Sequence, residues 1–125
     1  MHDYVLFSTA SSLASALGAR RNPISVQMGS GIPDGILRYV INLPYNDLER
    51  LEEVVEANWY ELAAIMVEPV MGNSAGILPQ AGWLEKTREL CDRYGIVLIF
   101  DEVKTVFRIA LDRSTSGSGL TWLPL

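Results

Sequence analysis

Acidic residues directly follow two apolar runs in this sequence. Asp101 and Glu102 follow the run VLIF, and Glu68 follows the earlier run LAAIMV. A carboxylate at the end of a buried strand is partly desolvated, so it keeps its charge only beside a cation or strong hydrogen-bond donors. A protonated ring nitrogen or a metal ion would be such a partner, and these acids are therefore the first candidates for chemistry.

The two apolar runs predict a pair of strands joined by a helix. Such short, continuous runs are typical of parallel strands that are buried on both faces. Residues 82–95 between them place apolar side chains along one stripe, which predicts a helix ending at Gly95. Strand, helix and strand form a right-handed crossover, and ligands of parallel sheets bind beyond the carboxyl ends of the strands. We therefore expect Glu68 and Asp101 to face one crevice.

A second helix is predicted over about residues 47–58. Asn46 precedes it as a capping residue, and Glu49 stands three positions further on, as in a capping box. Residues 1–45 are rich in small and turn-forming residues, and no regular element is predicted there. The pattern indicates an α/β chain with a partial parallel or mixed sheet and flanking helices.

Composition argues against several classes of function. The 125 residues are 49% hydrophobic, which is enough for a globular core, and the net charge of −5 disfavours nucleic acid and anionic membranes as partners. The single cysteine, Cys91, cannot form an internal disulfide, and neither a zinc site nor a membrane-spanning run is predicted. We expect a cytoplasmic protein.

The residues alone leave several roles open for the acids. They can cap the turns after the strands, or pair with an arginine such as Arg108. A metal-dependent phosphotransfer site built from Glu68, Asp101 and Glu102 is a further hypothesis, although no glycine-rich phosphate loop with a lysine accompanies it.

Residues 61–110 narrow these alternatives, because they resemble the pyridoxal-phosphate-dependent class III aminotransferases. The shared pattern runs in order through EPV, GN, LC, YG, FDEV and FR. GN at 72–73 is similar to the glutamate-1-semialdehyde 2,1-aminomutase branch, as are HDYVLFS and INLPYNDLERLEEVV. The resemblance implies that residues 1–110 are an interior fragment of the large, cofactor-binding domain of a fold-type I transferase.

The resemblance also implies roles for individual residues. Asp101 matches the aspartate that keeps the pyridine nitrogen of pyridoxal 5′-phosphate protonated, and Val103 matches the apolar residue packed on one face of the ring, with an ordinary core valine as the alternative. Glu68 and Asn73 match a loop beside the substrate side of the cofactor, where a supporting role and a hydrogen-bonded turn are both compatible. Lys104 stands near the phenolic oxygen, where the family commonly has glutamine or an apolar residue.

Other family features are expected outside this segment. The family's Schiff-base lysine follows the FDEV aspartate by a few tens of residues, so Lys104 is not that lysine and no catalytic residue is assigned in this chain. No metal ligand is assigned either. Residues 111–125 lose the resemblance and predict an unstructured tail. We expect a chain that holds part of the cofactor site and is inactive alone.

The implied reaction is amino-group transfer between a small amino donor and a keto acceptor, or within an amino aldehyde. Full-length family members are usually homodimers. The alternative is a non-catalytic remnant or interaction module derived from such an enzyme.

Overall fold

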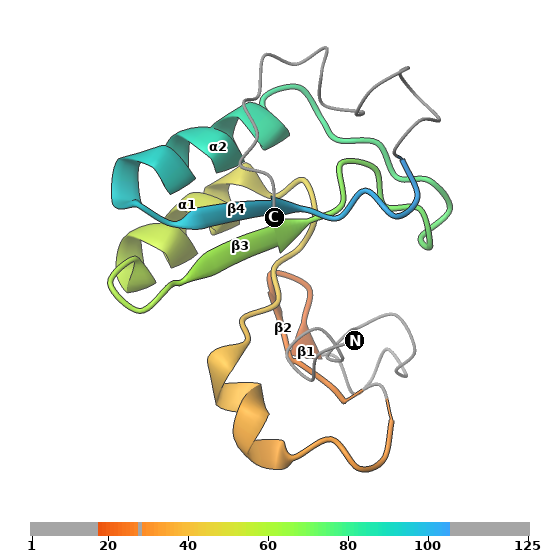
Figure 1. Ribbon diagram of the computed structural model, residues 1–125. Coiled ribbons are helices and arrows are strands. Elements are labelled where there is room, and N and C mark those ends of the chain that lie inside the picture. Colours follow the sequence, from red (N-terminus) through yellow and green to blue (C-terminus); the bar gives the residue numbers. More distant parts are fainter. Residues whose placement is uncertain (1–17, 28, 106–125) are drawn as a thin grey trace. The chain divides into compact units, whose positions relative to one another are not determined.

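The computed structural model describes residues 18–27 and 29–105 (Figure 1). The chain divides into two compact units, Met1–Arg50 and Leu51–Leu125. The predicted tail at 111–125 and Arg108 lie outside the described residues. No helix in the described part of the chain is both long and apolar enough to cross a membrane.

The second unit contains the predicted crossover. Strand β3 (Ala64–Val67), helix α2 (Trp83–Tyr94) and strand β4 (Val97–Phe100) follow one another, and β3 and β4 pair in parallel (Figure 1). Ala64 lies opposite Val97, and Val67 lies opposite Phe100. The α/β prediction with a parallel strand pair is therefore confirmed.

Helix α2 ends as its sequence predicts. Gly95 follows it with a φ of 70°, in the left-handed region that glycine enters without steric cost. The N–H of Ile96 donates to the Cys91 carbonyl at 2.9 Å, which satisfies one of the last carbonyls of the helix. This turn feeds the chain directly into β4.

Helix α1 (Leu48–Asn58) and α2 lie side by side on one face of the two strands (Figure 1). An ion pair between Lys86 Nζ and Glu52 Oε1, at 2.7 Å, joins the two helices. The buried apolar side chains come from these helices and from the residue before β4. They are Leu51, Val54, Val55, Trp83, Leu90, Cys91 and Ile96.

The prediction that both strands are buried on both faces is wrong for the described residues. Met66 is 51% exposed and Val97 is 48% exposed, and exposure alternates along β3. The physical reason is that α1 and α2 cover only one face of the strand pair, while the apolar runs would suit a sheet covered on both.

The predicted cap of α1 is displaced by one residue. The carboxylate of Asp47, through Oδ1, accepts a hydrogen bond from the Arg50 N–H at 3.0 Å. Asn46 has a φ of 67°, whereas a capping residue needs extended backbone. The capping residue is therefore Asp47 and not Asn46.

The first unit has short elements in a region where the sequence predicts none. Strands β1 (Gly18–Ala19) and β2 (Asn22–Pro23) pair antiparallel, and a 3-10 helix covers Asp34–Tyr39. Gln27 Nε2 donates to Ile32 O at 2.8 Å and to Asp34 Oδ1 at 2.7 Å, which braces the start of that helix. Such elements depend on individual hydrogen bonds and leave no hydrophobic period to detect.

Candidate functional site

Glu68 and Asp101 follow neighbouring strand ends. Val67 and Phe100 are the last paired residues of β3 and β4, and the acids are the next residue on each strand. The N–H of Asp101 donates to the Val67 carbonyl at 3.0 Å, so the ladder continues one step beyond the strands. The backbone thus brings the two acids to the same edge of the sheet, and the crevice that the sequence predicts there stays a prediction.

The Asp101 side chain is part of a turn. Its Oδ1 accepts a hydrogen bond from the Val103 N–H at 3.0 Å, and the residue is half-buried. This is the side-chain to backbone bond typical of aspartate turns. The turn fixes the direction of the carboxylate and leaves Oδ2 as the oxygen that can accept a bond from a ligand N–H. The turn-capping and ligand-binding interpretations of Asp101 are therefore compatible.

Glu68 also closes a turn. Its Oε2 accepts a hydrogen bond from the Gly72 N–H at 3.0 Å. The following loop is closed by a bond from Met71 N to Ile77 O at 3.1 Å, and Asn73 is exposed within it. The alternative of a hydrogen-bonded turn is thus observed for Glu68, and the carboxylate orders the loop after β3.

Val103 and Lys104 lie on the surface after β4. Val103 is 77% exposed, so it is not the ordinary core valine that the sequence leaves open. Lys104 is exposed, and its stem lies against Gly72: a Cβ built at Gly72 would be 2.6 Å from Lys104 Cγ and 2.8 Å from Lys104 Cβ. The loops after β3 and β4 therefore meet through Gly72 and Lys104.

A short turn anchors the segment after β4. The N–H of Thr105 donates to the Glu102 carbonyl at 3.1 Å, and Thr105 is only 4% exposed. This backbone contact gives Glu102 a structural part in the turn. The sequence alone predicts no structural role for Gly72 or Thr105. The one local indication is the glycine at position 72, in the loop that follows Glu68.

The described residues do not assemble the metal site considered from the sequence. No three His, Cys, Asp or Glu side chains gather as a metal site requires within residues 18–27 and 29–105. Glu68, Asp101 and Glu102 therefore do not form the ligand set of a metal-dependent phosphotransfer centre.

Cys91 is a buried thiol within α2. Burial raises the pKa of the Cys91 thiol to about 11. The thiol is therefore protonated at neutral pH, and it is not an activated nucleophile.

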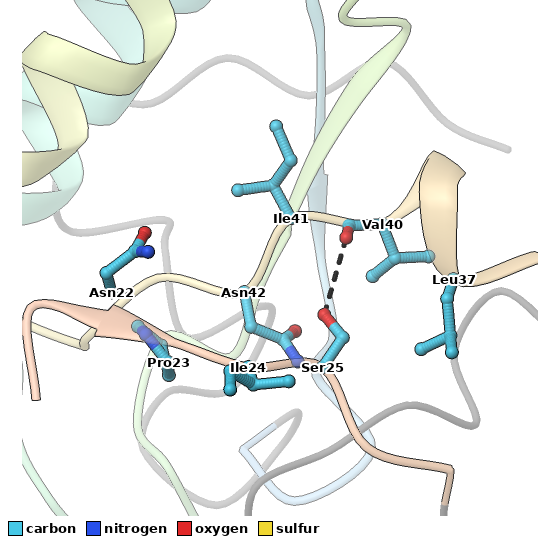
Figure 2. Close-up of a pocket in the computed structure, with 8 residues that line it drawn as sticks. All are labelled: Asn22, Pro23, Ile24, Ser25, Leu37, Val40, Ile41 and Asn42. Carbon is cyan, nitrogen blue, oxygen red and sulfur yellow. Dashed lines mark hydrogen bonds between the residues drawn. The ribbon is translucent and has the colours of Figure 1, made fainter. Parts of the chain in front are cut away.

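The first unit contains a separate hollow of about 360 Å³ (Figure 2). Ser25 Oγ donates to the Val40 carbonyl across it at 3.3 Å. Its lining has amide, hydroxyl and aliphatic groups but no acid, lysine, histidine or cysteine. The residues are Asn22, Pro23, Ile24, Ser25, Leu37, Val40, Ile41 and Asn42. Among these described lining residues, none is a general base that could activate the Ser25 hydroxyl.

Comparison with known proteins identifies the family. The family model for aminotransferase class-III matches residues 12–110. A glutamate-1-semialdehyde 2,1-aminomutase from Cytophaga hutchinsonii is 44% identical over 96 residues, and glutamate-1-semialdehyde 2,1-aminomutase 2 from Brevibacillus brevis is 40% identical over 112 residues. The chain belongs to the class III aminotransferases.

Solved structures agree with this assignment. The chain is similar to an omega-transaminase from Sphaerobacter thermophilus, with a TM-score of 0.82, 34% identity and 97% of this chain covered. A transaminase with PLP bound has a TM-score of 0.78 at 28% identity, also over 97% of this chain. The α/β fold is thus that of a piece of a fold-type I transferase.

The chain spans only part of these proteins. The matches cover 77% of this chain but 22% of the Cytophaga relative, and 90% of this chain but 26% of the Brevibacillus relative. The two transaminase structures are covered to 27% and 26%.

Proposed function

We propose that this chain supplies part of the pyridoxal 5′-phosphate site of an enzyme that transfers amino groups in the manner of class III aminotransferases and glutamate-1-semialdehyde aminomutases. The observation that carries the proposal is the fixed position of Asp101. Its backbone N–H is bonded to Val67 and its side chain to the Val103 N–H.

The residues at the strand ends suit a protonated pyridine ring. Such a ring needs an anion beside its N–H and an apolar surface against one face. Asp101 offers a carboxylate oxygen at the sheet edge, and Val103, two residues further on, offers an exposed aliphatic side chain. The acceptor and packing groups therefore match the chemical needs of this cofactor.

Each residue has a distinct task in this proposal. When bound, pyridoxal 5′-phosphate supplies a ring that accepts the electrons left when a substrate C–H bond breaks. Asp101 would accept the hydrogen bond from the ring N–H and so hold that proton on the nitrogen. Val103 would pack against the ring and exclude water from that face. Glu68 orders the loop that contains Asn73 through its bond to Gly72, and this loop would support the substrate side of the site.

The whole protein's activity is part of the same proposal. The relatives' name, glutamate-1-semialdehyde 2,1-aminomutase, suggests an amino aldehyde as substrate, and the wider family suggests an amino donor with a keto acceptor. We infer a cytoplasmic homodimer for the full-length enzyme. The 125-residue chain by itself is proposed to be inactive, because its lysines do not include the family's Schiff-base lysine.

Calorimetric titration with pyridoxal 5′-phosphate tests the assignment of Asp101. Asp101→Asn keeps the shape and a turn acceptor but removes the charge, and Glu102→Gln is the matched control at the neighbouring acid. A hydrogen bond to a charged group contributes about 1.5–3 kcal/mol, so we expect Asp101→Asn to weaken binding ~10-fold or more. Glu102→Gln should bind like the wild-type chain.

The outcomes separate the two functions under consideration. If Asp101→Asn binds as tightly as the wild-type chain, Asp101 does not hold the ring nitrogen. If the folded wild-type chain binds no cofactor at all, the non-catalytic remnant or interaction module replaces the present proposal.

A further inference from the structure

Two lysines, Lys86 and Lys104, are the only ε-amines in the sequence, and they lie in different surroundings. Lys86 Nζ lies 2.7 Å from Glu52 Oε1 and 3.3 Å from Glu89 Oε2. Its hydrogen bonds to Glu52 and then Glu89 raise the pKa of Lys86 above its ordinary value. The Lys86 amine therefore lies between acids of α1 and α2 and not at the ends of β3 and β4.

Lys104 stands at the candidate cofactor site instead. It follows Val103 directly and is three residues from Asp101. The close approach of its Cβ and Cγ to Gly72 fixes the near end of the side chain between the loops after β3 and β4. The Lys104 amine therefore extends from a stem that is held beside the strand ends.

We propose that Lys104 is a site of reversible covalent capture of aldehydes, with pyridoxal 5′-phosphate as its first ligand. The inference rests on the proposed function, because Asp101 and Val103 must bring the aldehyde-bearing ring beside this amine. Holding two reactants in contact raises their effective concentration far above that in solution. Lys104 then reacts ahead of Lys86.

The reaction is a condensation without oxidation or reduction. The neutral Nζ attacks the aldehyde carbon and forms a C–N bond. The carbonyl oxygen takes up both amine protons and leaves as water, which gives a C=N bond. The capture is reversible through the reverse addition of water, and added borohydride traps it by delivering hydride to the C=N carbon.

Peptide mapping after reduction tests the proposal on the full 125-residue chain. The chain is mixed with less than one equivalent of pyridoxal 5′-phosphate, reduced with borohydride and digested, and the label on each lysine is measured by mass spectrometry. We expect Lys104 to carry ~10-fold more label than Lys86, a preference equal to about 1.4 kcal/mol. In denaturant the two lysines should be labelled equally.

Variants show whether the preference depends on the site. Asp101→Asn should reduce label at Lys104 toward the level at Lys86, while Lys86→Gln should leave label at Lys104 unchanged. Propanal, an aldehyde without a ring, should modify Lys104 to the same extent in the wild-type chain and in Asp101→Asn.

Two results would overturn the inference. One is equal labelling of the lysines in the folded chain, and the other is a Lys104 label that Asp101→Asn does not lower. Titration of Lys104→Arg with the cofactor separates this failure from that of the proposed function. If Lys104→Arg still binds in an Asp101-dependent way, only the covalent capture is wrong; if it and the wild-type chain do not bind, both proposals fail.

Discussion

The Asp101 carboxylate accepts the backbone N–H of Val103 at 3.0 Å, so the residue proposed to hold a ligand also shapes the turn that presents its neighbour. One side chain therefore makes the structural contact and would also make the proposed contact with a ligand. They can be separated because the turn needs only an acceptor, whereas the ring N–H needs a negative charge.

Asp101→Ala and Asp101→Asn should differ in stability. Alanine removes the turn acceptor, and the lost hydrogen bond should lower the free energy of unfolding by about 0.5–1.5 kcal/mol. Asparagine keeps an acceptor and should stay within ~0.5 kcal/mol of the wild-type chain. Urea denaturation followed by tryptophan fluorescence measures both, since Trp83 is buried. Equal stability of the two variants would show that the turn bond contributes nothing.

Gly72→Ala should destabilise the loop contact after β3. The new Cβ would lie 2.6 Å from Lys104 Cγ, so one of the two loops must shift. Overpacking of this kind costs about 1–3 kcal/mol. Gly35→Ala is the control, because a Cβ there meets nothing within 4 Å. Adding Lys104→Ala to Gly72→Ala should restore part of the loss in urea denaturation, and an undiminished loss would contradict the contact.

Substitutions on the covered and exposed sides of the β3–β4 pair should change the free energy of unfolding by different amounts. Leu90 is fully buried, and Leu90→Ala should cost about 2–5 kcal/mol. Met66 is 51% exposed, and Met66→Ala should change the free energy of unfolding by less than ~0.5 kcal/mol. A large loss in Met66→Ala would mean that the open face of β3 is covered in solution.

Cys91 should make stability fall in mild alkali. Burial raises the pKa of the thiol to about 11, so the folded chain keeps this proton at pH values where the unfolded chain has lost it. The unfolded thiol titrates at about pH 8.5, and stability therefore falls as the pH rises from there towards the folded pKa. The stability advantage of wild type over Cys91→Ala should shrink between about pH 8 and 10. A constant difference across that range would show that Cys91 does not titrate differently on unfolding.

The crossover could be predicted because its signals are local and redundant. Residues 82–95 combine a helical apolar stripe with Gly95 at the end, and continuous apolar runs flank them on both sides. The observed α2 ends at Tyr94 before a left-handed Gly95, as that pattern requires. The same local signals predict that Glu68 and Asp101 follow neighbouring strand ends.

Other features could not be predicted because they depend on what packs around each residue. The exposure of Met66 depends on how many layers cover the sheet, and an apolar run does not specify that number. Asn46 and Asp47 are both good capping residues by type, and the left-handed backbone at Asn46 decides between them. The contact of Gly72 with Lys104 depends on the paths of two loops that are distant in sequence.

The parallel pairing of β3 with β4 also sets the order of events during synthesis. Val67 and Phe100 pair although the whole of α2 and its flanking loops separate them along the chain. Parallel strands need such a crossover, so β4 can align beside β3 only after α2 has been made and the loop entropy has been overcome. A nascent chain that has emerged only as far as α2 contains Glu68 and its loop, but not Asp101. Glu68 and Asp101 are therefore brought to the same edge of the sheet in a single late step, when β4 docks beside β3.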